Sequence, residues 1–323
     1  MTMLKKLVSS SMFLPLCALA VLLLFNIIFV DDFLSIQMAN GHLYGRIIDI
    51  LCRSSSLTIL SLGMTFVIAT SGIDISVGAV VAISAAVCCM IIGGRGDGVP
   101  ENPMLLAMIT AVGAGVICGA WNGLLVSKIK IQPVVATLIL MVAGRGIAQL
   151  LTKGQIITVY YTPFSYIGGH LPGSILPTPI FIAAAMIIIV VLILKRTSLG
   201  LFIQSVGINP TASRYSGISV ALIIFLVYAF SGFCAGVSGL IESSLIKAAD
   251  ANNAGLNMEM DAILAVALGG TLLSGGKFYI GGSIVGAITI QTLTTTMYAI
   301  GVSSDQLPVV KAITVIILCL IQS

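Results

Sequence analysis

Long apolar runs separated by short polar segments extend along the sequence. Each run approaches the roughly 20 residues that an α-helix needs to cross a bilayer. Ten runs can be marked, at residues 11–30, 47–70, 76–93, 103–127, 131–152, 178–194, 219–242, 260–273, 280–300 and 307–322. One run is short and two begin in glycine-rich sequence, so eight or nine crossings also fit the pattern. The runs are too continuous for the strands of an outer-membrane barrel. We expect an all-α polytopic membrane protein with about ten transmembrane helices, some broken or re-entrant, in one domain over residues 1–323.

The composition supports this class. Of the 323 residues, 58% are hydrophobic and 8% are charged, whereas a soluble domain has about a quarter charged residues. The first run follows Lys5 and Lys6 and contains the sequence ALA at 18–20, which resembles a signal peptide with its cleavage site. Because the run continues to Val30, it is too long for a signal core, and we expect an uncleaved first helix.

The distribution of cations predicts the orientation. With the N-terminus inside, ten crossings place eight cations inside, namely Lys5, Lys6, Lys128, Lys130, Lys195, Arg196, Arg214 and Lys277. Six lie outside, namely Arg46, Arg53, Arg95, Lys153, Lys247 and Lys311. The excess is modest, but the inner clusters at 128–130 and 195–196 adjoin the ends of apolar runs, as the positive-inside rule requires. We expect both termini to be cytoplasmic.

In this orientation, residues 195–218 form the largest cytoplasmic segment. Asn209 and Pro210 are typical of an N-cap and the first position of a helix, and Gly217 is typical of a helix stop. The sequence therefore predicts about two helical turns over 210–216. Such a helix is either a docking element for a cytosolic partner or only a connector.

The stretch TSGIDISVGAVVAIS at 70–84 predicts a break between two helices. Gly72 and Gly78 weaken a helix, and Asp74 with Ser76 resembles an N-cap pair. A carboxylate in apolar sequence is costly unless it is paired or hydrated, and such groups often mark a transport path. The alternative, which is the commoner role for an aspartate at such a place, is a cap on the next helix at the cytoplasmic surface.

Two further features lie within apolar sequence. The glycine-dense stretch at 268–287 predicts close packing of helices through small residues. Arg145 lies well inside a run, between two glycines and near Gln149. It either faces a hydrated cavity, pairs with a carboxylate, or extends toward the outer surface. The acid- and amide-rich segment 242–261 is either a receiving surface for a partner or solute, or a solvated loop.

No motif in the sequence suggests chemistry on a substrate. The stretch GGTLLSGGKF at 269–278 fails as a phosphate loop because Thr271 stands where the first glycine is required and Phe278 replaces the Ser or Thr. The two histidines, His42 and His170, form no catalytic or metal-ligating group by spacing. Seven cysteines lie almost wholly in apolar runs without C-x-x-C spacing, which is typical of core residues. They are Cys17, Cys52, Cys88, Cys89, Cys118, Cys234 and Cys319.

Two motifs in order resemble a known family. GMTFVIATSGIDISVGAVVAIS at 63–84 resembles the second-to-third helix signature of the permease subunits of bacterial sugar ATP-binding-cassette (ABC) importers of the ribose and galactose type. VGINPTASRYSGI at 206–218 resembles their cytoplasmic V-G-x-N-x-x-A-x-x-x-G-I element. IDIL at 48–51, IQPVVATLILMVAGRG at 131–146 and ADANNAGL at 249–256 resemble the galactofuranose branch of that family. The resemblance covers nearly the whole chain.

The resemblance implies a non-catalytic subunit in the bacterial inner membrane. It implies a cytoplasmic ATPase that holds ATP and magnesium, a second homologous permease in a heterodimer, and a periplasmic sugar-binding protein, with no cofactor of the chain's own and no nucleic acid. The segment 195–218 is then the cytoplasmic loop with the coupling helix. The residues expected to couple are Gly207, Asn209, Pro210, Ala212, Arg214, Ser216 and Gly217.

A neutral, hydroxyl-rich solute needs amides, hydroxyls and charges along its route in place of water. The candidates for the translocation path are Asp74, Asn122, Arg145, Gln149 and Glu242. An ion-coupled secondary transporter is the main alternative, since it too has broken helices and intramembrane charges. A channel is less compatible, because the sequence has no charged ring or filter motif, and a scaffold is disfavoured because almost the whole chain is apolar.

Overall fold

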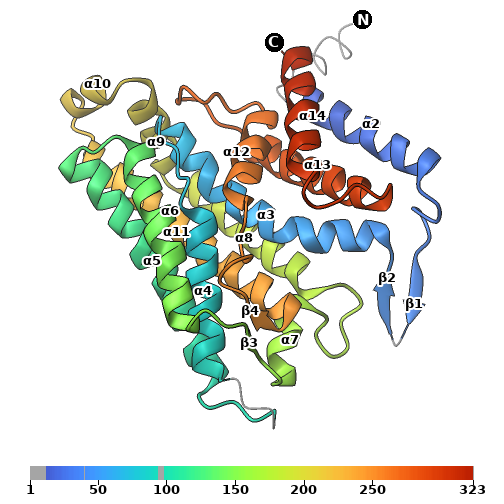
Figure 1. The fold of residues 1–323 in the computed structure, drawn as a ribbon. Helices are drawn as coiled ribbons and strands as arrows, with labels where there is room; N and C mark the ends of the chain where they lie inside the picture. The colour runs from blue at the N-terminus through green and yellow to red at the C-terminus, as the bar shows by residue number, and fades with distance from the viewer. Residues whose placement is uncertain (1–11, 40, 94–97, 323) are drawn as a thin grey trace, which may run out of the picture.

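The computed structural model describes residues 12–39, 41–93 and 98–322, and within these ranges the chain is mostly helical (Figure 1). The long helices are α2 (Phe13–Phe29), α3 (Arg46–Ala69), α4 (Val77–Ile92), α5 (Met104–Leu124), α6 (Pro133–Thr152), α8 (Thr178–Arg196), α11 (Val220–Ile246), α13 (Ile280–Ala299) and α14 (Leu307–Gln322). The shorter ones are α7 (Thr162–Gly168), α9 (Leu199–Ile208), α10 (Pro210–Tyr215) and α12 (Met258–Leu268). A π-helical turn, η1 (Leu125–Ile129), continues α5.

Each of the ten predicted apolar runs overlaps one of these helices, so the all-α prediction is confirmed. Within the described residues, five helices are long and apolar enough to cross a membrane, namely α3, α5 with η1, α6, α8 and α11. α4 and most of α2 are apolar but shorter. The number of crossings and the orientation of the termini stay predictions. Lys5, Lys6, Arg95 and Asp97 lie outside the described residues, as does the side chain of Cys319.

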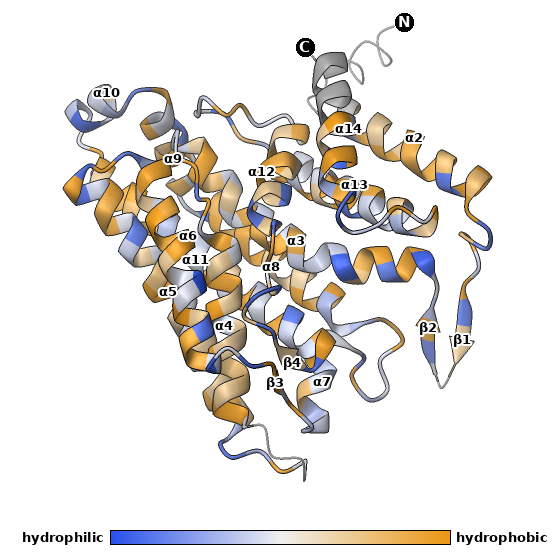
Figure 2. Cartoon of the chain, viewed as in Figure 1, coloured by the Kyte–Doolittle hydropathy of each residue, from blue (hydrophilic) through white to orange (hydrophobic). Residues whose placement is uncertain are grey.

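α3 is the central helix of the bundle. It packs against α8, α11, α12 and α13, and 89% of its most apolar window is buried. By contrast, large apolar side chains such as Ile117, Val142 and Leu150 are exposed on the outer faces of α5 and α6. Figure 2 shows these apolar outer helices. A bilayer offers such side chains a favourable environment, whereas water does not.

Glycines allow α5 and α11 to approach closely. Gly115 and Gly119 of α5 face Gly232 and Gly236 of α11, and a Cβ atom added at Gly115 would lie 2.9 Å from the Cα of Gly236. This is the small-residue packing typical of membrane helices. Close packing through glycine also joins α12 and α13, because Gly286 of α13 lies against the backbone of α12. The prediction of close packing in the stretch 268–287 is therefore confirmed.

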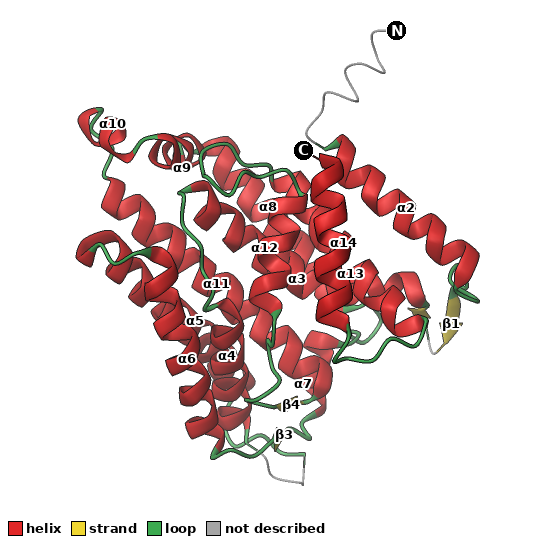
Figure 3. Ribbon diagram, turned by 45° about the horizontal axis from the view of Figure 1, so that its top comes forward, coloured by secondary structure: helices red, strands yellow, loops and turns green. Residues whose placement is uncertain are grey.

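The two ends of the bundle differ. α10 lies at the end where α2 begins and α14 finishes, which we call the α10 end (Figure 1). Two small antiparallel sheets lie at the opposite end, the sheet end (Figures 1 and 3). β1 (Gln37–Ala39) pairs with β2 (His42–Tyr44), and β3 (Ile157–Thr158) pairs with β4 (Ala248–Ala249).

The prediction that the cysteines are core residues is confirmed for four of the six that the structure describes. All six are free thiols; Cys52, Cys88, Cys89 and Cys234 are buried, and Cys17 and Cys118 are half-buried. They belong to apolar helices, and among the described residues no cluster of histidine, cysteine and acidic side chains has the arrangement of a metal site.

Candidate functional site

The break between α3 and α4 holds a buried carboxylate. Asp74 is 1% exposed. Its Oδ1 atom accepts hydrogen bonds from the backbone N–H of Ser76 (3.1 Å) and from the Ser76 hydroxyl (2.6 Å). Its Oδ2 atom accepts one from the hydroxyl of Ser231 on α11 (2.9 Å). A buried carboxyl group needs such partners, because without them it loses the hydration it has in water.

A third helix contributes to this network. Asn122 of α5 is fully buried and donates from Nδ2 to the hydroxyl oxygen of Ser76 (2.8 Å). Its Oδ1 atom is buried and has no hydrogen-bond partner among the described residues. Asp74, Ser76, Asn122 and Ser231, which we call the Asp74 network, therefore tie the break to α5 and α11. Asp74 is not a cap at the molecular surface, so this part of the sequence-based interpretation is wrong: close packing around the break has buried it.

Arg145 and Gln149 form a second group on α6. Nη1 of Arg145 donates to the carbonyl oxygens of Ala251 (3.2 Å) and Ala254 (2.5 Å). Nε2 of Gln149 donates to Oδ1 of Asn252 (2.7 Å). The two side chains lie one helical turn apart and both bind the loop at 250–254. Within the described residues Arg145 forms no ion pair with a carboxylate, so its immediate role is to hold this loop against α6.

Glu242 of α11 belongs to neither group. Its carboxyl group lies near Ser56 of α3 and within electrostatic reach of Arg53. The five candidates for the translocation path are thus divided among three places. Two share the Asp74 network, two hold the loop at 250–254, and Glu242 faces α3.

The predicted helix in the segment 195–218 is present. α10 begins at Pro210, and Oδ1 of its N-cap Asn209 accepts a hydrogen bond from the N–H of Ala212 (2.9 Å). Gly217 ends it with a φ of +84°, in the left-handed region that glycine adopts without strain. The helix stands out from the bundle (Figures 1 and 3). Tyr215 at its end is 89% exposed.

Six of the seven residues expected to couple are exposed on α10 or at its ends. They are Asn209, Pro210, Ala212, Arg214, Ser216 and Gly217. The sequence analysis did not predict α9, the helix that precedes them. α9 lies against α3, α8 and α11, and its Ile203, Val206 and Gly207 are buried. The segment 195–218 is therefore a docked helix followed by an exposed one, and not an open loop.

Gly207, the seventh residue, is buried inside this chain. A Cβ atom at this position would overlap the carbonyl oxygen of Ala69 and would lie 2.6 Å from the N–H nitrogen of Gly276. The expectation that this glycine gives room to a partner needs a correction: the atoms it makes room for belong to the end of α3 and to the loop 274–276. A signal was present in the sequence, because glycines occur at all three meeting segments.

Ser71 joins these three segments. Its hydroxyl lies within hydrogen-bond distance of the carbonyl oxygens of Gly207 (3.0 Å) and Ser274 (2.9 Å). The N–H of Gly276 donates to the carbonyl oxygen of Ala69 (2.9 Å). We call this set of contacts the Ser71 junction. It lies three residues before Asp74, so the end of α9 contacts the same helix break that carries the buried carboxylate.

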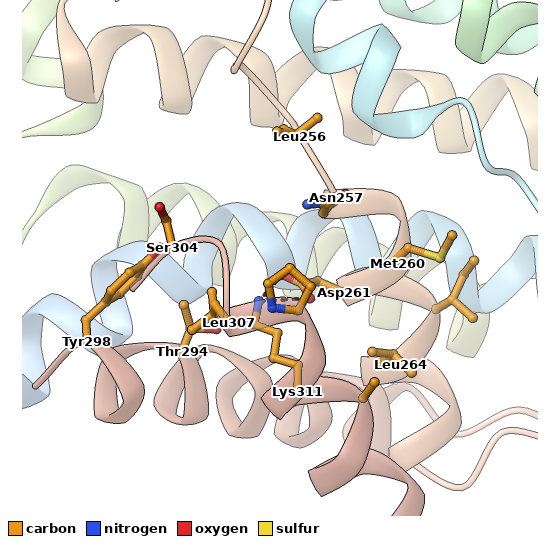
Figure 4. Close-up of a pocket in the computed structure, with 13 residues that line it drawn as sticks. Leu256, Asn257, Met260, Asp261, Leu264, Thr294, Tyr298, Ser304, Leu307 and Lys311 are labelled. Atoms are coloured by element: carbon orange, nitrogen blue, oxygen red, sulfur yellow. Dashed lines mark hydrogen bonds and ion pairs between the residues drawn. The ribbon is translucent and has the colours of Figure 1, made fainter. Parts of the chain in front are cut away.

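One ion pair is found among the described residues, in a cavity of about 650 Å³ bounded by α12, α13 and α14 (Figure 4). Nζ of Lys311 on α14 donates to both carboxyl oxygens of Asp261 on α12, at 2.7 and 3.0 Å. The orientation prediction placed both residues outside. The sequence analysis did not pair them, because they are 50 positions apart.

The fold and the two motifs define a class of protein. A family described as "Branched-chain amino acid transport system / permease component" matches residues 46–321. The chain belongs to this family of transport permeases, which are multi-pass inner-membrane proteins.

Three relatives narrow the comparison. The chain is 44% identical to the galactofuranose transporter permease protein YtfT of Escherichia coli strain K12, over 95% of this chain and 88% of that protein. It is 38% identical to the fructose import permease protein FruF of Bifidobacterium longum, over 99% and 89%. It is 35% identical to the ribose import permease protein RbsC of Escherichia coli strain K12, over 88% and 87%. No solved structure matches the chain.

Proposed function

We propose that this chain is the permease subunit of an ABC importer for a monosaccharide, with galactofuranose as the first candidate. The substrate class rests on the relatives, whose names specify galactofuranose, fructose and ribose. If ATP drives transport, a separate ATPase must hold it, because the sequence has no phosphate loop. A second homologous permease and an external sugar-binding protein complete the proposed assembly.

The observation that carries the proposal is α10. It is a capped, exposed helix at the end of the bundle where we place the cytoplasm, and it follows directly on α9, which is docked in the bundle. A short rigid element of this kind suits insertion into a cleft of a partner. In this proposal the ATPase binds the exposed residues of α10 and moves α9 with it.

The Ser71 junction then offers a route for this movement. The end of α9 contacts Ser71 and the loop 274–276, and the chain continues from Ser71 to Asp74. Closely packed backbone transmits displacement because it has no space in which to absorb it. A shift of α9 would therefore reach the Asp74 network, which ties α5 and α11 to the break. Binding and hydrolysis of ATP by the partner would in this way change the packing of helices along the sugar path.

The test uses a bulky side chain on the exposed face of α10. In the complete importer, with its ATPase and binding protein, Ala212→Trp should reduce co-purification of the ATPase and sugar uptake by about tenfold or more, a loss of at least about 1.4 kcal/mol in binding. Because Ala212 is exposed, the thermal stability of the isolated permease should not change.

The matched control is Ser198→Trp, which adds the same bulk at an exposed position at the start of α9, where the side chain makes no capping hydrogen bond. This variant should bind the ATPase and transport sugar normally. Full uptake by Ala212→Trp would refute the coupling role of α10. An ion-coupled transporter, whose buried cation-binding candidate would be Asp74, predicts uptake by the purified chain alone under an ion gradient and without ATP.

A further inference from the structure

A polar hollow of about 410 Å³ opens at the sheet end of the molecule. Its walls come from β2, the first turns of α3, α7 with the loop that follows it, and the last turn of α11. They come from three separate parts of the sequence, residues 42–53, 165–177 and 244–247, and Figure 1 shows them at the end opposite α10. The volume lies within the range of about 300–1,000 Å³ that is usual for small-molecule sites.

Aromatic rings form one wall of the hollow. The rings of His42 and His170 lie 4.5 Å apart, and the ring of Tyr44 lies 5.3 Å from that of His170. Nδ1 of His42 lies 2.6 Å from the carbonyl oxygen of Ser174, which holds its ring in place. Nε2 of His170 is buried and has no hydrogen-bond partner among the residues that the structure describes. The wall thus offers flat ring faces together with a polar atom that lacks a partner.

Charged side chains on α3 form the second wall. Asp49 and Arg53 line the hollow and are one helical turn apart, so they project from the same face. Neither side chain forms a hydrogen bond or an ion pair within 4 Å among the described residues. Lys247, at the end of α11, adds a second cation. With Glu242 beside Arg53, the two acids balance the two bases, so the surroundings favour a neutral solute over an anion.

Polar contacts continue from this wall into the bundle. Ser56 lies on α3 one turn beyond Arg53 and near Glu242 of α11. The Ser56 hydroxyl is hydrogen-bonded to that of Ser238 on α11. Ser56 and Ser238 are fully buried. A line of charged and hydroxyl groups therefore runs from the hollow to the interface between the central helix and α11.

We propose that this hollow is a binding site for a monosaccharide on the face where the sugar enters. The proposal rests on the function proposed above and adds to it the place where the sugar first contacts the permease. The carbon face of a sugar ring packs on the aromatic wall. Adjacent hydroxyls donate to Asp49 and accept from Arg53, because a carboxylate only accepts and a guanidinium only donates hydrogen bonds. This division of roles suits a solute that carries pairs of hydroxyls.

The experiment measures protection of an engineered thiol at the mouth of the hollow. In Tyr44→Cys, the new thiol is labelled with a maleimide that does not cross membranes, using the full-length chain in the assembled importer in lipid. Galactose, fructose and ribose are the probes, and Ser165→Cys, which also lines the hollow, is a second reporter. Labelling should be lost along a saturable curve as one of these sugars is added.

Protection should disappear when Arg53→Gln or Asp49→Asn is added to the reporter. It should persist with Asp305→Asn, which removes an exposed acid from outside the hollow. Unchanged labelling of both reporters at every sugar concentration overturns the inference. So does labelling that is blocked by the binding protein but not by sugar, since the hollow would then be a protein-docking surface.

Uptake by the unaltered importer separates this inference from the proposed function. If the assembled importer transports sugar with ATP but shows no protection, the binding site is refuted and the function stands. If protection occurs but ATP drives no uptake, the site stands and the function as an ABC permease fails.

Discussion

The ion pair between Lys311 and Asp261 predicts that α14 is held to α12 by an electrostatic contact. At 2.7 Å, two unit charges attract by about 6 kcal/mol at an effective dielectric constant of about 20. Desolvation offsets much of this attraction. Lys311 is 8% exposed as a residue, so removing one partner leaves the other charge largely out of water. Such single removals cost about 3–5 kcal/mol, whereas replacing both charges by apolar groups is often neutral.

The assay is thermal unfolding of the purified protein in lipid nanodiscs. Lys311→Met and Asp261→Leu should each lower the apparent melting temperature by about 10 °C, because about 1 kcal/mol corresponds to roughly 2–4 °C in proteins of 150–250 residues. The double variant should recover most of that loss, with a coupling energy of at least about 1.5 kcal/mol. Single variants that melt with the parent protein, or a double variant that loses the sum of both, would refute this account.

Two further predictions concern the α10 end and the sheet end. Gly207→Ala should lower both thermal stability and uptake, because its Cβ atom would overlap the backbone of Ala69, even though alanine is the better helix former by about 1 kcal/mol. The control is Gly113→Ala, at a helical glycine with no atom near the added Cβ, which should be neutral or stabilising. Equal melting temperatures of the two variants would contradict this explanation. At the sheet end, the pKa of His170 lies below its usual value because burial disfavours the charged ring and His42 lies beside it. The unfolded chain therefore binds a proton at this histidine more readily than the folded chain does. The contribution of the neutral ring to the free energy of unfolding is fully present above about pH 6.5 and is lost as the pH falls through the lowered folded-state pKa. The protection factors of the amide hydrogens in the loop 169–177, which are corrected for the intrinsic pH dependence of exchange, should fall on acidification through this range. They should lose that dependence in His170→Phe, and an unchanged pH dependence in the variant would contradict the assignment to His170.

Features that depend on neighbours in sequence could be predicted without coordinates. The apolar runs place the long helices because each helix satisfies its own backbone, which a bilayer requires. The limits of α10 follow from Asn209, Pro210 and Gly217, whose capping effects act within one turn. The close packing around 268–287 follows from the number of glycines. Each of these inferences needs at most one turn or one helix face of context.

The partners of the polar residues could not be predicted in this way. Asp74 is bound by Ser231, 157 positions away, and Arg145 by carbonyl groups more than 100 positions away. The sequence analysis selected both as unusual residues in apolar surroundings but could not say what they contact. It also left the two histidines without a role, because nothing near them in sequence shows that they share one hollow.

The sequence by itself determined the class of protein, the positions of the long helices and the short capped helix α10, since hydrophobicity and capping are properties of local segments. The tertiary structure decided that Gly207 serves the interior of this chain, that Asp74 is buried within a hydrogen-bonded network, and that His42, Asp49 and His170 line one hollow. The physical reason is that a side chain's burial and its hydrogen-bond partners depend on which helices pack together, and this packing brings together residues from distant parts of the chain.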